Sequence, residues 1–183
     1  MLILTSYFVN ISPNKHKKGF LMEETQEYSN KMIEAFVAKP EKTFWYQNAF
    51  SLFNVNGVDA MKWKWSWWAF FGGFLFLLYR KQYIPALVVL GASIFLGWIP
   101  FVGLIIAILV GGYSTYFVYK GYKSKLTEVE RSIPVEEEAK RVQTMQAIGG
   151  YHAWVVWIYV AFVGLIGFGI VAAVAIPALV GAQ

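Results

Sequence analysis

Residues 153–178 of this chain read AWVVWIYVAFVGLIGFGIVAAVAIPA, without a single charged side chain. The uncharged region extends further, from Val142 to Gln183, and His152 is its one side chain that titrates near neutral pH. A helix over this stretch is long enough to cross the roughly 30 Å hydrocarbon core of a bilayer with some tilt. We therefore predict a C-terminal transmembrane helix within residues 151–183.

Three more apolar runs precede it, at residues 65–79, 83–97 and 101–119. The chain is 57% hydrophobic and 15% charged, whereas a soluble domain is about 25% charged. Because the apolar residues are contiguous, too few polar side chains remain to face water. We predict an all-α, multi-pass helical membrane protein whose membrane domain covers residues 61–125.

Basic residues beside the runs predict the topology, because cytoplasmic segments are rich in Lys and Arg. The run at 65–79 would be about 22 Å long as a helix, which is short for a span. If it lies in the interface or is re-entrant, the basic residues at both of its ends and those at 120–125 all lie in the cytoplasm. We predict three spanning helices plus this aromatic interfacial or re-entrant helix, and a four-span arrangement is the alternative.

This topology places the chain in the bacterial inner membrane, with a cytoplasmic N-terminus and a periplasmic C-terminus. Amphipathic rings and cations at the run ends are the expected interfacial anchors. They are Trp65, Trp67, Trp68, Arg80, Lys81, Trp98, Lys120, His152 and Trp154.

The polar segments read as cytoplasmic helices. Within residues 22–60, apolar residues recur every four positions from Tyr28 to Phe36, Lys39-Pro40 ends that helix, and a second helix covers about 41–53 before a turn at 54–57. Residues 126–150 form a charged helix ended by Gly149-Gly150, in which Glu136–Lys140 and Glu137–Arg141 have i,i+4 spacing.

Residues 1–21 have a different interpretation. Lys17-Lys18-Gly19 can be encoded by a purine-rich sequence that resembles a bacterial ribosome-binding site, and Met22 follows shortly after it. We therefore expect translation to begin at Met22, with residues 1–21 a mis-annotated extension.

The sequence offers no catalytic constellation. It has no cysteine, its two histidines are His16 and His152, and the polar residues within the runs are Ser93, Ser114 and Thr115. No metal, cofactor or nucleophile–base set follows from these residues. The net charge of +5 does not indicate nucleic acid, because the cations flank apolar runs and match anionic headgroups. We expect a protein that is not an enzyme.

Small residues spaced along the runs predict helix packing. Helices in lipid associate by close backbone approach, which Gly and Ala allow. The expected packing positions are Gly103, Ala107, Gly111 and Thr115 in the third run and Gly169 and Ala173 in the fourth. The expected partners are membrane lipids and either another membrane protein or further copies of the chain. An accessory or scaffold subunit is the preferred function, and an oligomeric transport or channel component is the alternative.

Residues 63–81 read WKWSWWAFFGGFLFLLYRK. This stretch resembles a bacterial family of small membrane proteins of unknown function, whose signature is approximately W-x-W-A-A-F-F-F-G-P-F-W-F-L-Y-R-K. The similarity covers about residues 33–125, including Phe36–Lys39, Phe44–Tyr46 and Gly112-Tyr113 through Lys125. Gly73 stands where the family often has proline, which bears on a kink in this run. The resemblance implies a place in the membrane and no particular activity.

Residues 169–178, GIVAAVAIPA, are similar to the hydrophobic helix of type IV pilins. The chain lacks a prepilin cleavage motif, a glutamate at the start of that helix and a globular domain after it. The similarity implies an apolar helix that packs well.

Overall fold

A computed structural model describes residues 13–55 and 57–180 of the chain. In this part the protein has eight α-helices, one short 3₁₀ turn and one small hairpin of two strands, which confirms the all-α class. Residues 1–12 lie outside the described residues, and with them most of the expected extension. The elements are α1 (Pro13–Val37), α2 (Pro40–Phe53), β1 (Asn54–Val55), β2 (Val58–Asp59), α3 (Trp67–Gly72), α4 (Phe74–Tyr79), α5 (Tyr83–Leu96), α6 (Val102–Ser132), the 3₁₀ turn (Val135–Glu137), α7 (Glu138–Ile148) and α8 (Trp154–Val180).

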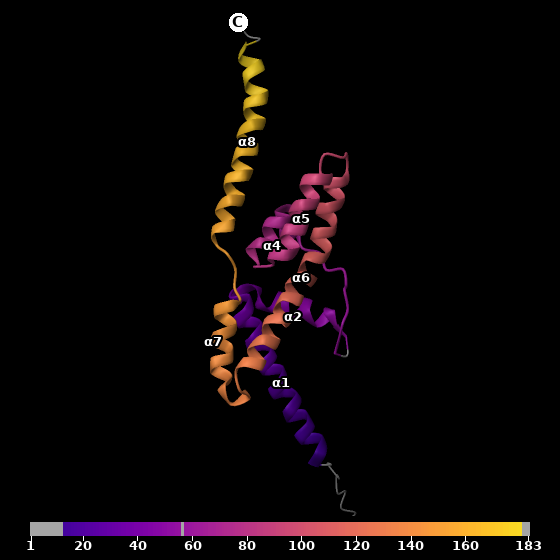
Figure 1. The fold of residues 1–183 in the computed structure, drawn as a ribbon, viewed down its shortest axis with the longest axis vertical. Coiled ribbons are helices and arrows are strands. Elements are labelled where there is room, and N and C mark those ends of the chain that lie inside the picture. The colour runs from indigo at the N-terminus through magenta and orange to yellow at the C-terminus, as the bar shows by residue number, and fades with distance from the viewer. Residues whose placement is uncertain (1–12, 56, 181–183) are drawn as a thin grey trace, which may run out of the picture.

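The molecule has a helical lobe and a set of apolar helices that project from it. The lobe consists of α1, α2, α7 and the C-terminal half of α6, and the α5–α6 hairpin and α8 extend from it on the same side (Figure 1). Within the described residues, two helices are long and apolar enough to cross a membrane, α6 and the 154–173 part of α8.

Aromatic rings from three helices form the core of the lobe. Phe36 of α1 and Phe50 of α2 each lie 5.3 Å, between ring centroids, from Tyr122 of α6. Phe53 is fully buried beside Tyr119. Because α6 continues without a break from its apolar half to Ser132, a single helix provides both a candidate span and one wall of this core.

The ends of the first two helices agree with the sequence prediction. The first helix ends at Val37, Ala38 adopts a left-handed φ of 52°, and Pro40 begins α2, which ends at Phe53. The predicted turn at 54–57 belongs to the hairpin, in which Val55 pairs with Val58. Gly57 has a φ of 84°, and its N–H donates to Asn54 Oδ1 at 2.9 Å.

The charged segment at 126–150 is divided differently from the prediction. Helix α6 covers its first part, and α7 begins only at Glu138. Glu136 and Glu137 lie in the 3₁₀ turn, where i,i+4 spacing does not bring side chains together. Lys140 pairs instead with Glu137 at i,i+3, 2.8 Å away.

Arg141, expected on a solvated face, is 7% exposed. Its Nε and Nη2 donate to the carbonyl oxygen of Ile133 at 3.0 and 2.7 Å, and Nη1 donates to the Tyr28 hydroxyl at 3.3 Å. It thereby fastens the end of α6 to α1 and α7.

Candidate functional site

The aromatic run is two short helices rather than one. Helices α3 and α4 meet at Gly73, whose φ of 52° and ψ of −130° break the helical path. Ser66 begins α3, and its hydroxyl oxygen accepts a hydrogen bond from Ala69 N at 3.4 Å. Each helix has only six residues.

An extended segment before α3 crosses the middle of α6. The backbone N–H groups of Lys64 and Ser66 donate to the carbonyl oxygens of Gly112 and Gly111 at 2.9 and 2.8 Å. Trp63 lies over Gly112, so that a Cβ added there would be 2.5 Å from its ring. Trp65 and Phe70 cover Gly111 in the same way, at 3.0 and 3.1 Å. The two glycines therefore form a contact surface for Trp63, Trp65 and Phe70 of the same chain.

The predicted packing positions of α6 have different surroundings. Thr115 is fully buried, Ala107 is half-buried, and Gly103 is exposed with no atom within 4 Å of an added Cβ. Of the four predicted positions, Gly111 and Thr115 therefore pack against the chain itself, whereas Gly103 is open and Ala107 lies between these two environments. Within the described part of the chain, the hydroxyls Ser114 Oγ and Thr115 Oγ1 are buried without a hydrogen-bond partner, as is Trp65 Nε1.

Residues 63–81, which we call the aromatic segment, contact the lobe at both ends. At its start, the ammonium of Lys64 lies 5.6 Å from the ring centroid of Trp45 in α2. At its end, Arg80 Nη1 donates to the carbonyl oxygen of Val37 at 3.2 Å, and Lys81 Nζ donates to that of Gly149. The chain thus leaves the lobe before α3 and returns to it after α4.

Four cations gather where the lobe meets the apolar helices. Arg80 is 3% exposed, and its guanidinium lies 4.4 Å from the ring centroid of Tyr46. Lys125 donates to the carbonyl oxygen of Ile148 at 2.7 Å, and the Lys39 ammonium lies 4.7 Å from the ring centroid of Tyr151. Lys81 is the fourth cation. Among the described residues, none of the four forms a salt bridge. Arg80, Lys81 and Lys125 cap the C-terminal ends of α1 and α7, which favour positive charge.

Arg80, predicted as an interfacial anchor, lies inside the protein. As an interfacial anchor its guanidinium would extend to the membrane surface, but it is folded into the protein against Tyr46 and the end of α1. The reason is that the unsatisfied carbonyl of Val37 and the Tyr46 ring offer a better environment than an isolated position among lipids. Lys81 is half-buried and likewise directed to a helix end.

The other predicted anchors lie at the surface or near it. Trp67, Trp68, Trp98 and Trp154 are between 50% and 80% exposed, whereas Trp65 is half-buried in the aromatic cluster. His152 Nε2 lies 2.6 Å from the Tyr83 hydroxyl, and its backbone N–H donates to Tyr79 O at 2.9 Å. These contacts fix the start of α8 to the junction of α4 and α5.

Asp59 is a site residue that sequence reasoning missed. Its carboxylate accepts from Tyr119 at 2.8 Å, Lys123 at 2.7 Å and Lys120 at 3.3 Å. The hydrogen bond from Lys123, followed by that from Tyr119, lowers the pKa of Asp59 from its ordinary value to about 2. Lys120, predicted as a membrane anchor, is therefore part of a clasp that holds the hairpin against α6.

Helix α8 is much less covered than α6, the other candidate span among the described residues. Only 6% of its most apolar window is buried, against 39% for that of α6. Gly164, Gly167 and Gly169 have no atom within 4 Å of an added Cβ, and Ala173 is exposed. Val155, near the start of the helix, is buried at 2% exposure, so α8 is packed at its base and open along its length.

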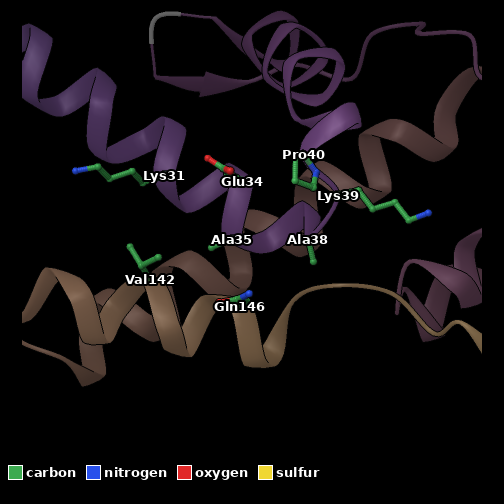
Figure 2. A pocket seen from close by; sticks show the side chains of 8 residues that line it. All are labelled: Lys31, Glu34, Ala35, Ala38, Lys39, Pro40, Val142 and Gln146. Carbon is green, nitrogen blue, oxygen red and sulfur yellow. The ribbon is translucent and has the colours of Figure 1, made fainter.

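The lobe carries a shallow cavity of about 320 Å³ between α1 and α7 (Figure 2). Glu34 and Ala35 line it from α1, Ala38 lines it from the residues that follow α1, and Val142 and Gln146 line it from α7. Lys39 extends away from it in Figure 2. In the part of the chain that the structure describes, no group of His, Cys, Asp and Glu could hold a metal ion.

Comparison of the chain with protein-family models, with curated proteins and with solved structures found no match.

Proposed function

We propose that this protein is a non-enzymatic accessory or scaffold subunit of a bacterial inner membrane, and that it binds a membrane-protein partner, or a second copy of itself, through α8. The observation that carries the proposal is the contrast within α8, which is packed at Val155 and uncovered along the rest of its apolar length. Its glycines leave room for the close backbone approach on which helix association in lipid depends.

The proposed topology has three spans, namely α5, the apolar half of α6, and α8. The contacts at both ends of the aromatic segment support an interfacial or re-entrant position for α3 and α4, because Lys64 and Lys81 reach the same lobe. Helix α5 has 14 residues, about 21 Å, so it crosses only together with the turn at 97–101 and with local adjustment of the bilayer. The lobe lies in the cytoplasm, where the basic residues are expected.

Reporter fusions test this topology. A fusion after Tyr119 should read cytoplasmic, and one after residue 180 should read periplasmic. A cytoplasmic signal from the second fusion would contradict the three-span arrangement and favour four spans.

Cysteine cross-linking tests the role of α8. Because the chain contains no cysteine, single cysteines introduced at positions 165–173 report on this helix alone. In native membranes, oxidation should cross-link most strongly at Gly169 and Ala173, one turn apart, and least at Val171, on the other face. A product of twice the mass indicates a second copy, and any other product identifies a partner by mass spectrometry. Equal and low cross-linking at all positions would contradict the proposal.

A matched pair of variants sharpens this result. Gly169→Leu should abolish the cross-linked or co-purified species, because a leucine side chain separates the backbones. Ile170→Leu exchanges isomers at an exposed position and should leave it intact. The same loss in both variants would mean that association does not depend on close approach at Gly169.

A further inference from the structure

We propose that Lys39, Arg80 and Lys81 form a binding site for the phosphate group of an anionic phospholipid, where the lobe meets the apolar helices. The inference rests on the membrane placement proposed above and adds a specific ligand class to it.

The first argument is charge balance. The C-terminal ends of α1 and α7 contribute roughly half a negative charge each, about one in total. Four cations lie near them, namely Lys39, Arg80, Lys81 and Lys125. Among the described residues no carboxylate forms a salt bridge with any of them, although Glu41 attracts Lys39 and Glu128 attracts Lys125 without such a contact. Positive charge therefore exceeds negative charge in a partly desolvated place, which is unfavourable without an anion.

The second argument is the state of Arg80. Its Nη1 has an acceptor in Val37 O, but Nε and Nη2 are buried without a hydrogen-bond partner among the residues that the structure describes. A buried guanidinium normally has its donors satisfied or an acid beside it. The Tyr46 ring offsets part of this cost, and a nearby anion would offset more because the low local dielectric strengthens its attraction.

The third argument is the position of the exposed cations. Lys39 and Lys81 are half-buried, so that both remain accessible, and both lie beside the 149–151 linker that leads into α8. The Tyr79 hydroxyl beside Lys39 raises the pKa of that lysine, which keeps it charged. Tyr79 and Tyr151 stack with centroids 5.0 Å apart at the bases of α4 and α8, a position typical of the headgroup level.

These features select a lipid over a free anion. The uncovered apolar side chains of α8 begin at Trp154, three residues after Tyr151, whose ring lies beside the Lys39 ammonium. Trp154 and Trp157 are 50% and 75% exposed. A phospholipid would satisfy both environments at once, because its phosphate meets the lysines while its acyl chains lie along α8. Basic pockets beside transmembrane helices on the cytoplasmic side bind anionic headgroups by this combination.

The test is lipid binding by the full chain in mild detergent, measured by native mass spectrometry and by thermal stabilisation. The probes are phosphatidylglycerol and cardiolipin, with phosphatidylethanolamine and inorganic phosphate as comparisons. Anionic lipids should bind and stabilise, and phosphatidylethanolamine should not. Equal stabilisation by inorganic phosphate would overturn the lipid assignment in favour of a free phosphate site.

Matched variants localise the site. Lys39→Gln/Lys81→Gln should weaken binding of the anionic lipids at least about tenfold. Lys42→Gln/Lys62→Gln removes the same charge at two exposed positions outside the cluster and should change it less than about twofold. Equal weakening in the two variants would overturn the site, because binding would then depend on surface charge in general.

Lys39→Gln alone covers the case in which the double variant fails to fold, since Lys39, unlike Lys81, caps no helix carbonyl. It should weaken anionic-lipid binding severalfold, and unchanged binding would contradict the site. Absence of lipid selectivity, with α8 cross-linking intact, would overturn this inference and leave the scaffold proposal standing.

Discussion

The lobe and α8 are both rich in apolar residues, yet they bury them in opposite ways. In α1, apolar residues occupy one face, and Met32, Phe36 and Val37 are at most 1% exposed. In α8, apolar residues surround the whole helix, and Phe162, Leu165 and Phe168 are all more than half exposed. A one-sided apolar face is buried within its own chain by the hydrophobic effect in water, whereas a helix apolar all round needs lipid or another helix. The same composition therefore stabilises the fold in the lobe and provides a surface in α8.

The sharpest test of this contrast exchanges one phenylalanine in each region. Phe36→Ala removes a ring that contacts Phe50 and Tyr122, and should lower the free energy of unfolding by about 3–5 kcal/mol. Phe168→Ala, at 75% exposure, should lower it by less than about 1 kcal/mol. Equilibrium denaturation in a mild detergent measures both. A comparable loss for Phe168→Ala would mean that α8 is packed against a second molecule under those conditions.

The second test compares two glycines of α6. In Gly112→Ala the new methyl group would lie 2.5 Å from the Trp63 ring, and this overpacking should cost about 1–3 kcal/mol. Gly103→Ala has open space and should be neutral or slightly stabilising, because Ala favours the helix by up to about 1 kcal/mol. Thermal unfolding followed by tryptophan fluorescence measures both effects. Equal unfolding midpoints for the two variants would show that Trp63 does not pack against Gly112.

The smallest expected effect concerns Asp59. Its pKa is depressed in the folded chain, from 3.8 to about 2, so its stabilising contribution is present above pH 3.8 and is lost as pH falls through about 2. Asp59→Asn should lower the unfolding midpoint near neutral pH by a few degrees at most, since the clasp is near the surface and screened by solvent. The difference between wild type and variant should shrink below pH 4.

Glu137→Gln is the matched control for Asp59, because its partner Lys140 forms an exposed pair. It should leave the midpoint unchanged at every pH. A difference between wild type and Asp59→Asn that persists undiminished at pH 2 would contradict the assigned role of the carboxylate.

Several elements could be predicted from the sequence because local signals determined them. The Lys39-Pro40 pair ended the first helix where the structure ends it, and uninterrupted apolar runs identified α5, α8 and the start of α6 to within a few residues, although α6 continues to Ser132, well past the predicted end at 119. Gly149-Gly150 closed α7 as expected, since Gly149 follows the last helical residue with a non-helical ψ of −143° and its N–H donates to Met145 O at 2.8 Å. These features depend on backbone sterics and on contiguous hydrophobicity, both of which are visible in one segment at a time.

The contacts between distant segments could not be predicted in the same way. The small residues around Gly111 suggested a neighbouring helix, but the segment that packs there is extended. The alternation of Trp63 and Trp65, two positions apart, was the signal that favoured an extended segment. The burial of Arg141 could not be predicted, because its acceptor, the carbonyl of Ile133, is free only as a result of α6 ending there, and no sequence motif marks that end. Asp59 became important only when α6 brought Tyr119 and Lys123 beside it.

The way in which α8 is attached has a mechanical consequence. Its 27 residues make a rod about 40 Å long, held near one end by Val155 and by the bonds of His152 to Tyr79 and Tyr83. Such a rod is a lever whose fulcrum touches the end of α1, because Gly150 bonds to Phe36. A tilt of about 10° at the fulcrum displaces the far end by about 7 Å. A lateral force on the rod would therefore reach the lobe through the short linker at 149–151, where Gly150 bonds to Phe36 and Lys39 lies beside Tyr151.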